Sequence, residues 1–353
     1  MSLIATGGRP KNLPVFEQAE KAVQKRVHLF RNIDDFLYIH KLAHTSRSIA
    51  VIGGGFLGSV LACALGYKGE SRGMKVYQIF PEKGVMSKVL PDYLSEFATE
   101  KIKLEGVDVL TEKSVKSASY SDKQVVLRLT DGSTVKVDHV VVAVGLQPND
   151  DIAKKSDLEI DSVRGGVMVN PELEAKPDIW VAGDVASFFD YKYGRGRVEH
   201  HSVADAMGKL AGQNMAGARK LYKHRPYFWS DLGADVSYQA IGEVDSNLET
   251  YSVFLNLPRK YKTKDEESSE KEETNSESSK NTVISQVTDK EDFLQGVVFY
   301  CKEGIIVGIV LWNIFGRGKI NAARQILEKN KELKNEDLYE LSKLLFRSYA
   351  KPS

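Results

Sequence analysis

The stretch that decides the fold is SIAVIGGGFLG at residues 48–58, in which a short apolar run leads directly into the pattern G-x-G-x-x-G. Gly53 permits a tight turn after the strand, Gly55 lets the backbone approach a pyrophosphate, and Gly58 lets the next helix pack close to the strand. The N-terminus of that helix offers N–H groups and a positive dipole end to phosphates. The stretch therefore predicts a dinucleotide-binding turn.

A second strand-like run, residues 75–80, ends just before Glu82. A carboxylate at this place accepts hydrogen bonds from the adenine-side ribose, which favours NAD(H) over NADP(H). Strand, glycines, helix, strand and acid follow one another in the order that this kind of site requires. The combination is therefore more specific than an isolated G-x-G-x-x-G.

The bulk composition excludes several classes of protein. The chain has 353 residues and a formal net charge of +1, which predicts two or three domains and no general attraction to nucleic acid or anionic membranes. We expect no transmembrane helix and no metal site, because none of the seven histidines lies in a metal-ligand spacing. Cys63 and Cys301 form no C-x-x-C pair, so dithiol chemistry is not expected, and Cys63 is interpreted as a small buried hydrophobe.

The pattern of apolar runs and turn signals divides the chain into segments. We expect a strand remnant at 1–8, a connector at 9–46 with a helix over 33–44, a nucleotide-binding unit at 47–145, an α/β segment at 146–222 and an α+β domain at 223–353. Further strands are expected at 107–110, 125–130, 134–137, 140–145, 179–184, 297–301 and 305–311, and further helices at 91–105, 202–216, 320–331 and 335–346.

Two segments have unusual sequences. Residues 1–8 read like the end of a buried strand that lacks upstream neighbours, which predicts a truncated chain with no targeting segment. Residues 262–280 contain seven acidic residues, four lysines and no large apolar side chain. Such a segment buries too little surface to offset its chain entropy, so it predicts a disordered loop, with a charged contact surface as the alternative.

Several motifs carry a resemblance to known flavoproteins. ATG at 5–7, AVGLQP at 143–148 and AGD at 182–184 together resemble the flavoproteins with two dinucleotide-binding folds, which bind FAD and a nicotinamide nucleotide. Five longer motifs are similar to the apoptosis-inducing factor family, namely GGGFLGS at 53–59, FPEKG at 80–84, VEHH at 198–201, FWSDLG at 228–233 and WNIF at 312–315. The resemblance implies an α/β fold, with a Rossmann-like NAD domain inserted in an FAD domain, followed by an α+β domain. Residues 1–8 would be the remnant of the first FAD half and residues 146–222 the second half.

The same resemblance implies cofactor-binding residues. To the three glycines of the turn it adds, as NAD-contacting positions, Phe56, Leu57, Glu82, Lys88 and Gly145. It places Glu199 and His200 near the nicotinamide and flavin, Asn313 near the nicotinamide site, and, in contact with FAD, Arg31, Asp184, His201 and Trp229. No catalytic side chain is implied, because hydride passes between the two cofactors. Without the resemblance, the histidines, Trp229, Arg31, Lys88 and Asn313 would be interpreted as structural or surface residues.

The implied function is hydride transfer from NADH to FAD in a mitochondrial oxidoreductase of the intermembrane space, with a role in cell death and a nuclear location on release. The implied partners are NADH, an intermembrane-space protein and, with NADH bound, a second copy of the chain. Residues 191–197 lie where the family has a localisation signal but carry only three positive charges, so weak or no DNA binding is expected.

Three departures from the family bear on function, and the first of them favours an alternative. The family's first G-x-G-x-x-G, which holds the FAD pyrophosphate, is absent, and Val60 and Gln239 stand where the family has glutamates. The alternative is a catalytically impaired chain that acts as a protein- or DNA-interaction module.

Overall fold

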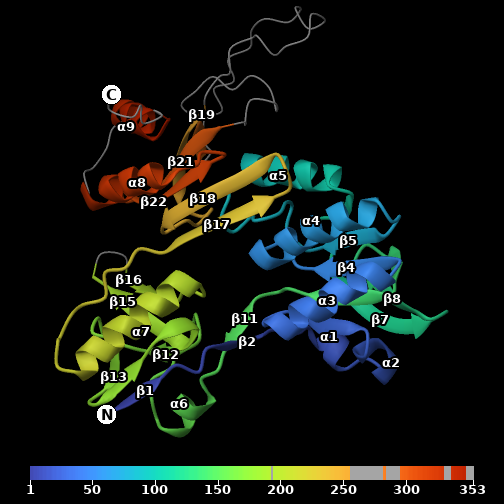
Figure 1. Cartoon of the computed structure of the whole chain (residues 1–353), viewed down its shortest axis with the longest axis horizontal. Helices are drawn as coiled ribbons and strands as arrows, with labels where there is room; N and C mark the ends of the chain where they lie inside the picture. The colour runs from blue at the N-terminus through green and yellow to red at the C-terminus, as the bar shows by residue number, and fades with distance from the viewer. Residues whose placement is uncertain (192–193, 255–280, 284–294, 330–334, 347–353) are drawn as a thin grey trace, which may run out of the picture. The chain divides into compact units, whose positions relative to one another are not determined.

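The computed structural model describes residues 1–191, 194–254, 281–283, 295–329 and 335–346 (Figure 1). The chain forms two compact units. Unit 1 contains Met1–Met86 and Thr99–Phe228, and unit 2 contains Ser87–Ala98 and Trp229–Ser353. Among the described residues, no helix has the length and apolar character needed to span a membrane.

A parallel five-stranded sheet forms the part of unit 1 that is predicted to bind a nucleotide (Figure 1). In spatial order its strands are β3 (Val27–Leu29), β10 (His139–Val142), β4 (Ser48–Ile52), β5 (Lys75–Ile79) and β6 (Val107–Leu110). Helices α3 (Ile33–Thr45) and α4 (Phe56–Glu70) connect β3 to β4 and β4 to β5. After β4 the chain builds β5 and β6 on one side and later returns to β10 on the other. The carboxyl ends of β4 and β10 therefore form the switch point at which such sheets bind ligands.

A small antiparallel sheet packs beside the parallel one. It consists of β7 (Val115–Ser121), β8 (Gln124–Leu129) and β9 (Thr134–Val137), and the predicted turn at Asp131-Gly132 joins its last two strands. Short helices α1 (Pro14–Glu17) and α2 (Lys21–Gln24) place Phe16 and Val23 in the same core as the apolar face of β8. Residues 9–46 thus supply β3, α3 and core side chains of this region.

The rest of unit 1 contains two further three-stranded sheets and helix α7 (His201–Met215). One sheet has the order β1 (Ser2–Ile4), β14 (Ile179–Val181), β13 (Glu174–Lys176), and the other β12 (Val167–Met168), β15 (Ala186–Asp190), β16 (Gly194–Gly196). A 3-10 turn, η1 (Gly183–Val185), follows β14, and a short helix, α6 (Asp151–Lys155), follows the two-stranded pair of β2 (Gly8–Pro10) and β11 (Leu146–Pro148).

The prediction of a buried first strand is wrong in one respect. Strand β1 exists and pairs in parallel with β14, but its side chains are mostly exposed, with Leu3 at 42%. The physical reason is that β1 is the edge of its sheet, so that only one neighbour covers it.

Unit 2 is built on a six-stranded sheet. Its order is β17 (Tyr227–Leu232), β18 (Val236–Gly242), β22 (Ile305–Trp312), β21 (Gly296–Lys302), β19 (Glu249–Phe254), β20 (Asn281–Val283). Helix α8 (Arg317–Lys329) packs on β18 and β22, and α9 (Asn335–Phe346) packs on β19 and β21. The buried Tyr300 donates a hydrogen bond to the Val89 carbonyl at 2.6 Å, which joins residues 87–98 to the sheet.

Most expected elements are present within a few residues of their predicted bounds. The hairpin of β21 and β22, helices α3, α7, α8 and α9, and α5 (Asp92–Leu104) are confirmed. Strands β7, β17, β18 and β19 were not predicted, because their sequences mix polar and apolar residues without a strong run. The acidic segment 262–280 lies outside the described residues.

Two histidines form a half-buried pair between neighbouring strands of the parallel sheet. His28 Nε2 lies 3.0 Å from His139 Nδ1, and the His28 ring also contacts Tyr38 of α3. Burial, together with His139, lowers the pKa of His28 to about 4. Burial also lowers the pKa of His139.

We predict that the free energy of unfolding falls as the pH drops from about 6.5 to about 4. In this pH window His28 is protonated in the unfolded chain but stays neutral in the folded protein. The unfolded state therefore binds more protons, and acidification favours unfolding. Urea unfolding at a series of pH values measures the slope. His28→Gln should flatten the slope, whereas His40→Gln, which removes an exposed histidine of α3, should retain it. An unchanged slope in His28→Gln would contradict the assignment.

Candidate functional site

The glycine turn after β4 is closed to side chains at three positions. Gly53 has a φ of +128°, and a β-carbon there would lie 2.3 Å from the Ala143 carbonyl oxygen. A β-carbon on Gly54 would meet the Phe80 ring at 2.6 Å, and one on Gly58 would lie 2.3 Å from the Gly53 oxygen. Gly58 therefore permits the close approach of helix and strand that its position in the motif predicts.

Two other glycines face open space at the same edge of the sheet. Apart from the glycine itself and its two chain neighbours, no atom of the described residues lies within 4 Å of where a β-carbon of Gly55 or Gly145 would stand. Gly55 is the N-cap of α4 and has no side chain that could cover the amides of the first turn. Gly145 follows β10 with a φ of +105°. These two backbone positions flank the switch point and leave room for a ligand to approach the main chain.

A buried glutamine supports the turn from below. Gln78 of β5 is fully buried, and its Nε2 donates to the Gly53 oxygen and to Ser59 Oγ, both at 3.0 Å. Ser59 Oγ in turn donates to the Gly54 oxygen at 3.1 Å. Gln78 Oε1 has no hydrogen-bond partner among the described residues. Sequence reasoning missed Gln78, although a polar residue inside an otherwise apolar buried strand was a usable signal.

The Phe228 ring contacts the rings of two residues that are far apart in the sequence, Phe56 and His200. It meets the ring of Phe56, the first residue of α4, edge-on at 5.0 Å between centroids. The His200 ring, at the N-cap of α7, lies 6.5 Å from the same ring. The structure thus connects a predicted NAD-contacting position with a predicted flavin-proximal one through a residue that the sequence analysis had quoted only as part of a motif. Leu57, beside Phe56, is also exposed.

The predicted FAD-contacting residues Arg31 and Asp184 are brought together. Arg31 Nη2 lies 2.6 Å from Asp184 Oδ2, although the two residues are far apart in sequence. Arg31 directly precedes α3, where Asn32 and Asp35 form a capping box that fixes the backbone. Asp184 lies in η1, and its side chain is only 10% exposed. The pair therefore joins the start of α3 to the end of β14.

His200 and His201 begin α7 in different environments. His200 Nδ1 accepts a hydrogen bond from the Ser202 N–H at 3.2 Å, whereas His201 is exposed. Burial, and then the neighbouring His201, lower the pKa of His200, while Asp184 opposes the shift. His200 is therefore neutral near pH 7. Glu199, just before it, forms an ion pair with Arg197 at 2.8 Å.

Three predicted site residues belong to unit 2. Lys88 is exposed, and its backbone carbonyl accepts from the Ser246 N–H at 3.1 Å. Trp229 lies on β17 with 57% of its surface exposed. Asn313 has a φ of +51°, and its side chain bonds to the Ser237 N–H at 2.7 Å and the Asp235 oxygen at 2.8 Å. The amide of Asn313 thus stabilises a turn.

The remaining positions complete the description. Glu82 follows β5 and is half-buried, and its backbone oxygen accepts from the Glu112 N–H at 3.0 Å. Val60 is exposed on α4, and Gln239 is half-buried on β18. Cys63 is buried, which raises the pKa of its thiol to about 12. In the part of the chain that the structure describes, no three His, Cys, Asp or Glu side chains gather as metal ligands would.

Two family descriptions match this chain, one for each part. "Pyridine nucleotide-disulphide oxidoreductase" matches residues 1–208. "Apoptosis-inducing factor, mitochondrion-associated, C-term" matches residues 211–329. The chain therefore belongs to the pyridine nucleotide-disulphide oxidoreductase family, a class that uses FAD and NAD(H). Its C-terminal part is similar to that of apoptosis-inducing factor.

Individual relatives agree with this assignment. "Putative apoptosis-inducing factor 1, mitochondrial" of Drosophila melanogaster is 45% identical over 97% of this chain and 48% of its own length. "Apoptosis-inducing factor 1, mitochondrial" of Dictyostelium discoideum is 36% identical over 96% of this chain and 58% of its own length. The chain thus spans about half the length of these relatives.

A solved structure shows the same fold. The ferredoxin reductase from Rhodopseudomonas palustris superposes with a TM-score of 0.75 at 23% identity, over 97% of this chain and 74% of that one. The predicted fold class, family resemblance and cofactor class are thereby confirmed.

We predict that Gly58→Ala destabilises the protein by about 1–3 kcal/mol, because the added methyl group would overlap the Gly53 carbonyl. This overlap outweighs the better helix propensity of alanine. Gly55→Ala is the matched control, since its methyl group meets open space, and it should change stability by less than about 0.5 kcal/mol. Chemical denaturation of both variants measures the difference, and equal stabilities would refute the steric argument.

Proposed function

We propose that this chain forms the NAD-binding and part of the FAD-binding region of an oxidoreductase that transfers hydride from NADH to FAD. The observation that carries the proposal is the open glycine turn at the switch point. The Phe228 ring lies between Phe56, just after this turn, and His200 at the N-terminus of α7. The family supports the reaction class.

The residues of the turn fit a dinucleotide. Gly55 and Gly145 leave the main chain accessible, so a pyrophosphate can lie against the first-turn amides of α4 and the positive end of its dipole. Glu82, at the end of the next strand, can accept hydrogen bonds from the ribose hydroxyls. Phe56 and Leu57 present exposed apolar surface beside the turn. Together these residues bind and orient the nucleotide.

The proposed flavin-side residues also have suitable chemistry. The guanidinium of Arg31 forms an ion pair with the Asp184 carboxylate. That carboxylate can also accept a hydrogen bond from a ribityl or ribose hydroxyl. The lowered pKa of His200 favours its neutral form, and because Nδ1 accepts from the Ser202 N–H, Nε2 can donate a hydrogen bond to the cofactor. Bound FAD supplies the electron-accepting chemistry. We also assign His201, Glu199, Lys88, Trp229 and Asn313 to the cofactor sites, as their matching positions in the family suggest.

The location and partners form a second part of the proposal. The relatives are named as mitochondrial apoptosis-inducing factors, which supports a mitochondrial location and a role in cell death. We extend this to the intermembrane space, to release toward the nucleus, and to a protein partner and an NADH-linked second copy. Weak or no DNA binding is expected, because Arg195 and Arg197 bond to backbone carbonyls of the fold.

The direct test is a visible absorption spectrum of the purified chain, recorded anaerobically before and after addition of FAD and then NADH. The expected result is a protein-bound flavin band that bleaches with NADH. A chain that binds NADH but retains no flavin after desalting would contradict the oxidoreductase proposal for this chain.

We predict that Gly55→Ala weakens NADH binding about tenfold or more, because a methyl group would occupy the space in which the pyrophosphate approaches the backbone. Titration by NADH fluorescence measures the dissociation constant. The unchanged stability expected for this variant makes the loss specific, and wild-type affinity would show that the nucleotide binds elsewhere.

We predict that Glu82→Ser reduces the preference for NADH over NADPH by about tenfold or more, because the carboxylate both binds ribose hydroxyls and repels a 2′-phosphate. Parallel titrations with the two nucleotides give the ratio. Glu112→Ser, at an exposed neighbouring position, should leave the ratio unchanged. The same ratio in both variants would remove Glu82 from the site.

A further inference from the structure

Arg197 connects three separate segments of unit 1 through one guanidinium group. Its Nε donates to the Arg164 backbone oxygen at 2.8 Å. Its Nη1 donates to the Asp184 backbone oxygen at 3.1 Å and lies 2.8 Å from Glu199 Oε1. Three contacts from one planar group fix its position more tightly than a single ion pair would.

Two of these segments carry residues of the proposed cofactor sites. Asp184 belongs to the η1 turn, whose carboxylate pairs with Arg31. Glu199 immediately precedes His200, the N-cap of α7. Arg197 therefore holds the backbone of the first segment and the side chain of the second, while its own side chain is only 11% exposed.

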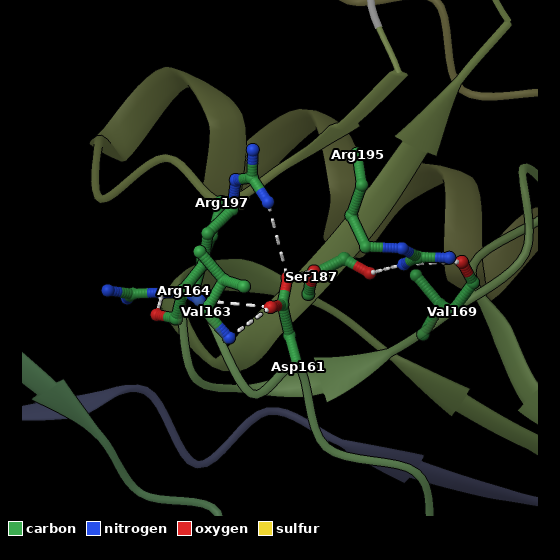
Figure 2. Close-up of polar contacts among 7 residues, drawn as sticks. All are labelled: Asp161, Val163, Arg164, Val169, Ser187, Arg195 and Arg197. Atoms are coloured by element: carbon green, nitrogen blue, oxygen red, sulfur yellow. Dashed lines mark hydrogen bonds and ion pairs between the residues drawn. The ribbon is translucent and has the colours of Figure 1, made fainter.

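The third segment is a rigid turn that anchors the arginine (Figure 2). Asp161 Oδ1 accepts from the N–H groups of Val163 and Arg164 at 2.9 Å, and its Oδ2 accepts from Ser187 Oγ at 2.7 Å. Burial disfavours the ionised carboxyl, but these hydrogen bonds outweigh it and hold the pKa of Asp161 below its usual value. The carbonyl that receives Arg197 Nε is consequently fixed in direction.

A glycine makes room for this arrangement. Gly166 has a φ of +84°, and a β-carbon there would lie 3.1 Å from Arg197 Cδ and 2.5 Å from the Val185 oxygen. The side chain of Arg197 thus passes over a backbone position that no larger residue could occupy without displacing it.

Arg195, which lies on β16 two residues before Arg197, has a different role (Figure 2). Arg195 Nη1 donates to the Ser187 oxygen at 2.7 Å and the Val169 oxygen at 3.3 Å. Its partners lie on β15 and just beyond β12. Arg195 therefore bonds to backbone carbonyls of the sheet, whereas Arg197 bonds to Asp184 and Glu199.

We propose that Arg197 is a positioning residue for the hydride-transfer end of the cofactor site, which sets the η1 turn and Glu199 relative to each other. The expected effect of Arg197 on hydride transfer rests on the proposed function, whereas its effect on the conformation of the η1 turn and Glu199 does not. Lysine cannot replace the arginine fully, because one ammonium group lacks the fork that reaches a carboxylate and two carbonyls at once.

The first test is backbone hydrogen–deuterium exchange of the whole chain with Arg197→Gln, Arg197→Lys and the matched control Arg195→Gln. Arg197→Gln should raise exchange about tenfold at 183–186 and 198–202 and leave 48–58 unchanged. Arg197→Lys should restore protection at 198–202, where charge suffices, but not at 183–186. Arg195→Gln should leave 183–186 and 198–202 within about twofold of the parent.

The second test separates positioning from a general structural role. With FAD bound, Arg197→Gln should lower kcat about tenfold and change KM for NADH less than about threefold, since the glycine turn and Glu82 still hold the nucleotide. Unchanged exchange in Arg197→Gln, increased exchange that extends to 48–58, or equal effects of Arg195→Gln would each overturn the proposal. If the parent chain shows no NADH-dependent flavin reduction, the proposed function fails, and the exchange pattern still decides the role of Arg197.

Discussion

The proposed nucleotide-binding region depends on the packing around the carbonyl group of Gly53. This carbonyl oxygen packs closely against the backbone of Gly58 and accepts a hydrogen bond from Gln78 Nε2. Both contacts exist only because two side chains are missing and one buried polar side chain is present. The helix can then begin directly at the end of β4, which places its amides at the switch point of the sheet. The position of the proposed nucleotide site follows from this crowding.

Buried polar groups perform a similar task elsewhere in unit 1. Gln78, Asp161 and Arg197 all bind backbone atoms of turns that carry or adjoin proposed site residues. An unpaired polar group in such surroundings is costly, so each turn is held in one conformation by the hydrogen bonds it completes. The site residues themselves, such as Glu82, Leu57 and His201, lie at or near the surface. Rigid, buried supports below exposed binding groups are consistent with a site that is largely preformed.

Much of the fold could be predicted because the relevant signals are local. The apolar runs at β4 and β10, the glycine spacing and the turn at Asp131-Gly132 each specify their own conformation within a few residues. Strands β7 and β17–β19 could not be found in this way, because their sequences mix polar and apolar residues without a strong run. A different limit applies to the exposed edge of β1, because its burial depends on how many strands flank it. Of the proposed site, the three glycines of the turn and Glu82 were accessible from spacing, whereas Gln78, Phe228 and Arg197 were not.

The sequence by itself determined the dinucleotide turn, its order of strand, helix and acid, and the family to which the chain belongs, because these features are encoded in contiguous residues whose backbone demands are specific. Only the tertiary structure decided that Arg31 meets Asp184, that Phe228 lies between Phe56 and His200, and that Arg197 holds Asp184 and Glu199 together. Each of these contacts except the Arg197–Glu199 pair joins residues that chain spacing leaves unrelated, and each requires the packed core to bring them within bonding distance. Local periodicity indicates which face of a helix or strand a residue occupies. It carries no information about which distant residue packs against that face.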